Sequence, residues 1–169
     1  MLLIVGCRTS ENMNEIKNPR IVVKKAERTI ELFDGETPVR KYRAVLGFAP
    51  VGDKERNGDG KTPEGDFYIF VKNDKSKYHL SLGVSYPDAA DAERGLAAGL
   101  ITEAERDAIV NAISEKRMPP QNTALGGEIY IHGGGIERDW TWGCVAVGNE
   151  EMTELFNAAR VGTPVSILP

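Results

Sequence analysis

Short runs in which apolar and polar residues alternate are the main pattern in the first half of the chain. Such alternation, enriched in β-branched and aromatic residues, is typical of strands with one buried face. It predicts strands at residues 20–25, 28–33, 39–47, 66–71 and 78–86. Asp34-Gly35 is a hairpin turn signal. We therefore expect the first three strands to form an antiparallel meander that is apolar on one face and basic on the other.

The alternation gives way to a helical pattern between residues 88 and 118, where alanine, glutamate and arginine dominate. Apolar residues recur there at helical spacing, which predicts helices at about 88–98 and 103–116. Thr102 and Glu105 match a capping box at the start of the second helix. We therefore expect a helical insertion between two strands.

Two short strand-like runs at 128–131 and 145–147 flank a glycine-bearing loop in the last third of the chain. A helix at about 149–159 and a strand at 165–168 follow. Together these patterns predict a mainly β, α+β fold. We expect an antiparallel β-sandwich or barrel-like sheet, a helical insertion at about 88–118 and a helix after Cys144.

Composition narrows the class of protein. The chain has 169 residues, enough for one domain with a sizeable core, and its 41% hydrophobic and 27% charged residues are ordinary for a globular protein. A net charge of −4 argues against a nucleic-acid-binding surface. No apolar run approaches the roughly 20 residues that a membrane-spanning helix needs. We expect a monomer.

Residues 1–7 are apolar, end in Ile-Val-Gly-Cys and resemble a bacterial lipobox, although a positive n-region is missing. We expect residues 1–19 to be a signal-like and linker segment, with a lipidated Cys7 as a membrane anchor. The alternative is a buried N-terminal strand with a passive cysteine. A Cys7–Cys144 disulfide is disfavoured if Cys144 is a nucleophile.

His132 and Cys144 are the candidates for chemistry. Each lies where a strand-like run meets glycines, so we expect them at the ends of neighbouring strands. A thiol attacks carbonyl groups as its thiolate, and a histidine can take its proton and remain beside it as imidazolium. The backbone amides around Gly143 and Cys144 are candidate oxyanion donors, and Asn149 is a candidate helix cap. Taken alone, Cys144 is more readily interpreted as a buried small apolar residue, and its joint setting with His132 and the flanking glycines favours the functional interpretation.

These residues carry a family resemblance. His132-Gly133, then Thr141-Trp142-Gly143-Cys144, then Asn149 resembles the catalytic motif of bacterial L,D-transpeptidases of the YkuD type. Thr62-Pro63-Glu64-Gly65-Asp66-Phe67 resembles a second conserved segment of that family. The resemblance covers about residues 20–169, which we expect to form an L,D-transpeptidase-like catalytic domain.

The resemblance implies a mechanism without a cofactor or metal. Cys144 would attack the carbonyl at the L-centre of meso-diaminopimelate in a peptidoglycan stem peptide, and His132 would protonate the leaving amine. An amine or water would then resolve the thioester. Gly133, through its carbonyl, would orient the histidine, and Gly143 would help to hold the oxyanion. Candidate substrate contacts are Thr141, Trp142, Trp140, Tyr86, His79 and Asn149.

One residue departs from the motif. Most members have an arginine two residues after the cysteine, where this chain has Ala146, and Gly-Cys-Val-Ala-Val is similar to a subgroup with Gly-Cys-Ile-Ala-Val. The subgroup includes amide hydrolases as well as presumed transpeptidases, so both reactions stay open. Arg138 and Asp139 are weaker candidates for binding the zwitterionic end of diaminopimelate.

Two further interpretations stay open. One is a non-catalytic wall-binding module, and the other is a zinc site formed by His79, His132 and Cys144, whose spacing lacks the paired ligands of zinc sites. Because polymerised peptidoglycan lies outside the cytoplasmic membrane, the resemblance implies a location in the cell envelope, in the periplasm or on the outer face of the membrane.

Overall fold

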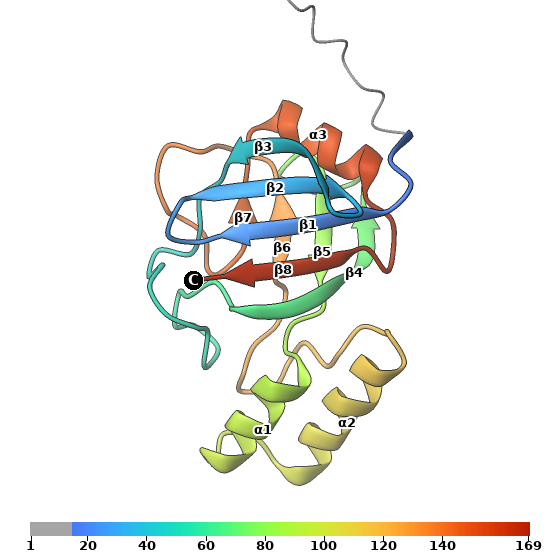
Figure 1. The fold of residues 1–169 in the computed structure, drawn as a ribbon. Coiled ribbons are helices and arrows are strands. Elements are labelled where there is room, and N and C mark those ends of the chain that lie inside the picture. Colours follow the sequence, from blue (N-terminus) through green and yellow to red (C-terminus); the bar gives the residue numbers. More distant parts are fainter. Residues whose placement is uncertain (1–14) are drawn as a thin grey trace, which may run out of the picture.

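The computed structural model describes residues 15–169 as a strand-rich α+β fold (Figure 1). The strands are β1 (Pro19–Lys24), β2 (Thr29–Asp34), β3 (Thr37–Arg43), β4 (Gly65–Asn73), β5 (Ser81–Val84), β6 (Tyr130–His132), β7 (Val145–Ala146) and β8 (Pro164–Leu168). The helices are α1 (Ala89–Ala97), α2 (Glu103–Ser114) and α3 (Asn149–Ala158). The predicted signal-like segment and Cys7 lie outside the described residues, apart from the end of the linker.

All eight strands belong to one sheet in the order β3-β2-β1-β8-β4-β5-β6-β7. The predicted antiparallel meander is confirmed, because β2 pairs antiparallel with both β1 and β3. The predicted sheet, which is otherwise antiparallel, has two parallel pairs that the sequence did not indicate: β1 with β8 and β6 with β7. β1 and β8 are distant in sequence, whereas β6 and β7 are consecutive strands joined by residues 133–144. Local alternation does not encode the direction of either pair.

The two edges of the sheet are joined by the segment after β3. Val45 and Ala146 exchange backbone hydrogen bonds of 2.9 and 2.8 Å, which connects this segment to β7. The sheet therefore curls on itself, as the predicted barrel-like arrangement requires. This closure places the backbone that precedes the long loop at 48–64 beside the residues that follow Cys144.

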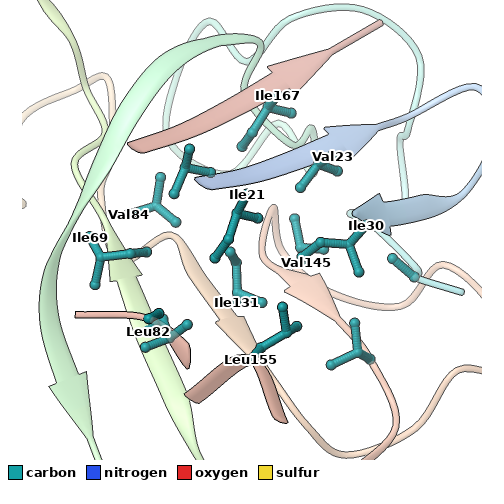
Figure 2. Close-up of a cluster of buried hydrophobic side chains, with 14 of the residues drawn as sticks. Ile21, Val23, Ile30, Ile69, Leu82, Val84, Ile131, Val145, Leu155 and Ile167 are labelled. Carbon is teal, nitrogen blue, oxygen red and sulfur yellow. The ribbon is translucent and has the colours of Figure 1, made fainter. Parts of the chain in front are cut away.

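The hydrophobic core fills the inside of the curled sheet. Figure 2 shows side chains from strands along the whole sheet and from α3 meeting there, among them Ile21, Ile131 and Leu155. The alternation in β1 and β2 explains this, since Ile21, Val23, Ile30 and Leu32 are all fully buried. Burying one such side chain stabilises the fold by roughly 1.5–3 kcal/mol. The core also includes Ile131 of β6 and Val145 of β7, so it stabilises these two short strands.

Helices α1 and α2 pack against each other beside the sheet, as Figure 1 shows, and form the predicted insertion. Both begin with a capping box. The box of Thr102 and Glu105 confirms the sequence prediction, and Asp88 with Asp91 forms a second one. A small separate core of Ala92, Ile101, Ile109 and Leu125 holds the insertion together. It is thus a local unit with its own packing.

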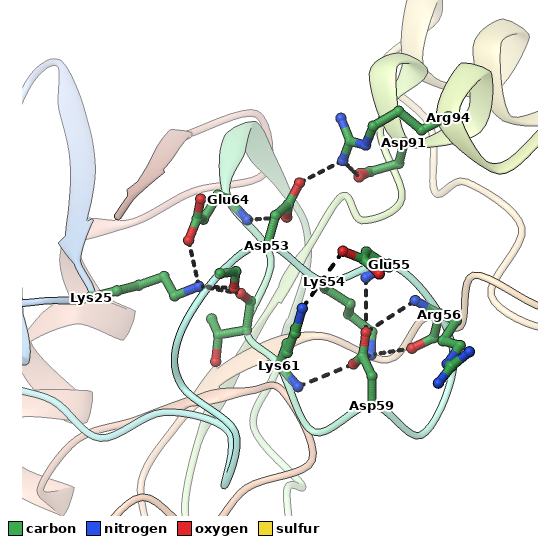
Figure 3. Close-up of polar contacts among 12 residues, drawn as sticks. Lys25, Asp53, Lys54, Glu55, Arg56, Asp59, Lys61, Glu64, Asp91 and Arg94 are labelled. Atoms are coloured by element: carbon green, nitrogen blue, oxygen red, sulfur yellow. Dashed lines mark hydrogen bonds and ion pairs between the residues drawn. The ribbon is translucent and has the colours of Figure 1, made fainter. Parts of the chain in front are cut away.

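The buried ammonium of Lys25 ties the loop at 48–64 to the sheet, and the exposed guanidinium of Arg94 ties it to α1 (Figure 3). The Lys25 ammonium donates to the carbonyls of Gly52 (2.6 Å) and Thr62 (2.8 Å) and pairs with Glu64 at 2.8 Å. Arg94 of α1 pairs with Asp53 of the loop at 2.5 Å. A buried charge is tolerated only when it is paired and hydrogen-bonded, so the contacts of Lys25 constrain the path of the loop.

Two predicted strands are shorter than expected. The third strand ends at Arg43, before the bridge at Val45. The strand predicted at 78–86 is limited to Ser81–Val84, because His79 has a φ of 74° in the left-handed region and interrupts the extended backbone. Pro19, expected in the linker, is instead the first residue of β1 and pairs with Asp34.

Candidate active site

The parallel pairing of β6 with β7 brings His132 and Cys144 to one side of the sheet. Ile131 pairs with Val145 and His132 with Ala146, so Cys144 lies level with Tyr130, two residues before the histidine. This confirms the prediction that the two lie at the ends of neighbouring strands. Both side chains line one cavity of about 510 Å³. That volume is within the usual range of ligand pockets.

The thiol of Cys144 is half-buried and not in a disulfide. Its Sγ accepts a hydrogen bond from the Tyr130 amide at 3.4 Å, and the S–H donates to the Glu128 carbonyl at 3.4 Å. Proton transfer to His132 therefore requires the S–H to turn away from Glu128. Catalytic hydrogen bonds are often incomplete in sites without substrate.

The imidazole of His132 is held on three sides. Its Nδ1 lies 2.6 Å from the Gly133 carbonyl oxygen, which can only accept, so Nδ1 carries the hydrogen. Tyr78 stacks on the ring at 4.7 Å between centroids, and Trp140 meets it edge-on at 5.6 Å. Nε2 is left as the basic nitrogen. These contacts fix both the tautomer and the plane of the ring.

A tight turn presents the thiol. Thr141 is buried; its hydroxyl donates to the Cys144 carbonyl (2.7 Å) and accepts from the Gly143 amide (3.1 Å). Gly143 has a φ of 130°, and a Cβ there would lie 2.7 Å from the Lys61 carbonyl oxygen. Only glycine fits this conformation and this close contact. Thr141 therefore shapes the turn, and the Gly143 amide already has a partner.

Asn149 holds the loop that follows His132. Its Oδ1 accepts from the Gly134 amide at 3.0 Å. The prediction that Asn149 caps the last helix is wrong, because Gly148 is the N-cap and Asn149 is the first residue of α3. A Cβ on Gly133 would lie 2.5 Å from this Oδ1, so the loop and the helix are in close contact. The structure gives Asn149 a positioning contact with the histidine loop.

Burial leaves both reactive groups neutral at rest. The pKa of the Cys144 thiol is raised to about 11, mainly by burial and less by the Glu128 carboxylate, whereas the Tyr130 amide and Lys54 act in the opposite direction. Burial also lowers the pKa of His132, partly offset by its bond to Gly133. Ala146 is fully buried and supplies no cation beside the sulfur.

Alkylation of Cys144 by iodoacetamide should therefore accelerate about tenfold per pH unit from about pH 7 to about pH 10, because only the thiolate reacts and the thiol pKa is about 11. Peptide mapping by mass spectrometry separates Cys144 from Cys7. The urea-unfolded chain is the reference, with thiols near the ordinary pKa of about 8.5. A rate that levels off below about pH 8 would contradict this expectation and indicate a preformed thiolate–imidazolium pair.

The other predicted substrate contacts lie in different surroundings. Trp140 is half-buried and donates from Nε1 to the Gly135 carbonyl at 3.3 Å. Trp142 is 70% exposed and packs edge-on against Phe48. His79 is exposed, and its Nε2 lies 2.9 Å from the Thr153 hydroxyl.

Tyr86 and Asp139 are not brought to the cavity that holds the thiol. Tyr86 is fully buried and donates to the Leu125 carbonyl at 3.0 Å, which places it in the core. Asp139 pairs with Arg28 at 2.8 Å and accepts from the Leu46 amide at 2.8 Å, so its carboxylate is used within the fold. Arg138 lines a separate hollow beside Trp140.

Sequence reasoning missed several residues of the cavity. Its lining also includes Asn73, Lys75, Ser76, Lys77, Tyr78, Ser81, Glu128 and Tyr130. Half of them belong to the segment that joins β4 to β5, which carries no recognisable motif. The aromatic Tyr78 beside a strand was the one available signal, and its role depends on a contact with His132 that lies 54 residues away (132 − 78).

The structure does not assemble the proposed zinc ligands. Within residues 15–169, no group of three or more His, Cys, Asp or Glu side chains is placed to hold a metal ion. Over the same residues, no helix is both long and apolar enough to cross a membrane.

A family model described as the L,D-transpeptidase catalytic domain, YkuD, matches residues 18–167. No curated protein matches the chain. The fold is similar to that of the helical cell shape determining protein Pgp2 from Campylobacter jejuni, with a TM-score of 0.61 and 20% identity over 89% of this chain and 47% of that one.

Two further solved structures share the fold. Bd1075 from Bdellovibrio bacteriovorus has a TM-score of 0.59 and 22% identity, covering 94% of this chain and 50% of that one. L,D-transpeptidase 1 from Mycobacterium tuberculosis has a TM-score of 0.53 and 13% identity, covering 90% of this chain and 62% of that one. The chain thus spans about half the length of Pgp2 and Bd1075.

Proposed function

We propose, from the premise that this chain belongs to the L,D-transpeptidase catalytic domain (YkuD) family, that it catalyses cysteine-dependent acyl transfer on peptidoglycan stem peptides. The observation that carries the proposal is the joint placement of His132 and Cys144 in one cavity, with the imidazole held so that Nε2 is its basic nitrogen. A thiol and an oriented base within one pocket are the requirements of nucleophilic acyl transfer.

The reaction begins with proton transfer from the Cys144 thiol to His132 Nε2. The sulfur attacks the carbonyl carbon at the L-centre of meso-diaminopimelate, and the carbonyl oxygen takes the negative charge. We propose that the Cys144 amide donates a hydrogen bond to this oxyanion. The Gly143 amide can donate to it as well only if it gives up its bond to the Thr141 hydroxyl. The intermediate collapses, the C–N bond breaks, and His132 returns its proton to the leaving amine. A thioester on Cys144 remains.

An incoming amine or water resolves the thioester, with His132 as base. The first gives a cross-link or an exchanged amino acid, and the second gives hydrolysis. Hydrolysis is the second candidate function. It is supported by the buried Ala146, which offers no fixed cation next to the sulfur. This residue also supports assignment to the subgroup with Gly-Cys-Ile/Val-Ala-Val.

Product analysis tests the proposal. Full-length protein is incubated with a meso-diaminopimelate tetrapeptide, with and without a D-amino acid as competing amine, and the products are identified by mass spectrometry. We expect loss of the terminal residue in both mixtures and an exchanged tetrapeptide only when the amine is present. Hydrolysis alone in both would establish the hydrolase. An unchanged tetrapeptide in both would contradict an enzymatic function and favour a wall-binding module.

The substrate suggests the setting of the protein. We propose that residues 20–169 form the catalytic unit, that it acts without a cofactor as a monomer, and that it works in the cell envelope. A lipidated Cys7 would keep it at the membrane surface. Pgp2 from Campylobacter jejuni is a helical cell shape determining protein, and we extend a role in cell shape to this chain as part of the proposal.

A further inference from the structure

Three charged residues line the cavity that holds Cys144 and His132. Lys75 and Lys77 come from the segment between β4 and β5, and Glu128 comes from the segment before β6. We call these three residues the charged rim. All three are exposed, and none of them forms an ion pair with another of residues 15–169. Many other charged side chains of the protein are paired, so this concentration of unpaired charge at one cavity is notable.

The rim carries opposite charges on two different segments. Lys77 lies over one side of the Tyr78 ring at 5.1 Å, and the same ring stacks on His132. Glu128 is placed on the side of the thiol, since its carbonyl accepts the S–H of Cys144. Its carboxylate is also close enough to raise the pKa values of both Cys144 and Tyr130. The cavity therefore presents cations on the Tyr78 side and an anion on the thiol side.

Glu128 is held in place by its own backbone. It has a φ of 55°, in the left-handed region that non-glycine residues rarely adopt. Its amide donates to Gln121 Oε1 at 2.7 Å, and its carbonyl is taken by the thiol. Such backbone conformations are retained mainly where the surrounding structure or a function requires them. The carboxylate thus projects from a fixed point beside the nucleophile.

We propose that the charged rim is a subsite for a zwitterion, in which Glu128 binds the ammonium and Lys75 with Lys77 binds the carboxylate of the D-centre of diaminopimelate. This inference rests on the proposed function. The D-centre is joined to the reacting L-centre by three methylene groups, so it enters the same cavity as the carbonyl that Cys144 attacks. Tyr78 and Tyr130 line the cavity and offer apolar surface to the methylene groups.

The subsite has a consequence for reactivity. Without substrate, the Glu128 carboxylate opposes ionisation of Cys144. An ammonium group bound to Glu128 offsets that negative charge. The correct side chain therefore favours the thiolate as it binds, whereas a substrate without the D-centre amine leaves the carboxylate unpaired beside the sulfur.

Calorimetric binding tests the subsite. The full-length Cys144→Ala protein is titrated with the meso-diaminopimelate tetrapeptide, with the same peptide N-acetylated at the D-centre, and with the peptide amidated at the D-centre carboxylate. Glu128→Gln should weaken binding of the unmodified peptide about fivefold, the upper range for exposed ion pairs, and leave the N-acetylated peptide unaffected. The double change Lys75→Gln/Lys77→Gln should act in the same way on the unmodified peptide and not on the amidated one.

Matched controls use the same substitutions away from the cavity. Glu36→Gln changes a side chain that is 95% exposed in the β2–β3 turn, and Lys116→Gln changes an exposed lysine after α2. Neither should alter binding. Equal weakening of all three peptides by a rim variant would overturn the inference, as would the absence of measurable binding. A further peptide is amidated at the D-glutamate carboxylate of the stem and not at the D-centre. If Lys75→Gln/Lys77→Gln no longer weakens binding of that peptide, the inference is also overturned.

Binding and turnover separate the two proposals. If the Cys144→Ala protein shows the expected rim dependence but the wild-type chain leaves the tetrapeptide unchanged, the proposed function fails and the subsite stands. If the wild-type chain processes the peptide and Glu128→Gln changes KM equally for the unmodified and N-acetylated peptides, the subsite fails and the proposed function stands.

Discussion

Cys144→Ala should abolish processing of the meso-diaminopimelate tetrapeptide, with a fall in kcat/KM on the order of 10⁴-fold or more, as for other catalytic nucleophiles. The variant removes the sulfur that forms the thioester, and no other described cysteine can replace it. Product formation measured by mass spectrometry checks the result. The fold should be unaffected, because the side chain is half-buried and its partners are the backbone groups of Tyr130 and Glu128.

Two variants make this result specific. Cys7→Ala changes the other cysteine of the chain and should retain full activity on a soluble peptide. Cys144→Ser keeps the shape of the side chain but replaces the thiol by an alcohol of much higher pKa, so it should be nearly as inactive as the alanine variant. Full processing by folded Cys144→Ala protein would refute the assignment of the nucleophile.

Lys25→Ala should lower the free energy of unfolding by about 3–5 kcal/mol, the usual effect of removing one partner of a buried ion pair. The Lys25 side chain is 3% exposed. Its loss leaves Glu64 and the carbonyls of Gly52 and Thr62 without their shared donor. Urea unfolding followed by circular dichroism measures the change. Because the loop at 48–64 adjoins the Gly143 turn, activity should fall as well.

Lys41→Ala is the matched control, since it also removes a lysine that pairs with glutamates. Its side chain is 54% exposed where it contacts Glu27 and Glu31. Ion pairs in contact with solvent contribute little to stability, so we expect the urea midpoint to stay close to that of the parent. A similar loss of stability for both variants would contradict the idea that burial makes Lys25 important.

Much of the fold follows from local pattern. The alternation at residues 20–33 places Ile21, Val23, Ile30 and Leu32 on the buried face, and the helical spacing after Thr102 is confirmed as α2. His132 and Cys144 could be assigned to adjacent strand ends because glycines mark where each run stops. The strand expected at 78–86 was wrong at its start, since the left-handed backbone of His79 has no counterpart in alternation.

The surroundings of the reactive pair could not be predicted in the same way. Tyr78 reaches His132 only because β5 pairs with β6, where Ser81 lies opposite His132. Thr141 and Asn149, predicted as substrate contacts, accept hydrogen bonds from the backbone amides of Gly143 and Gly134. Each of these contacts depends on strand order and register, which residues distant in sequence decide together.

The sequence by itself determined which chemical groups are present and which short segments are strands or helices, because backbone periodicity and side-chain chemistry are local properties. The tertiary structure alone decided that β6 and β7 run parallel, that Lys75, Lys77 and Glu128 line the cavity of the thiol, and that burial raises the pKa of Cys144. These properties arise from the burial and mutual distance of groups that are far apart along the chain, which only the folded packing sets.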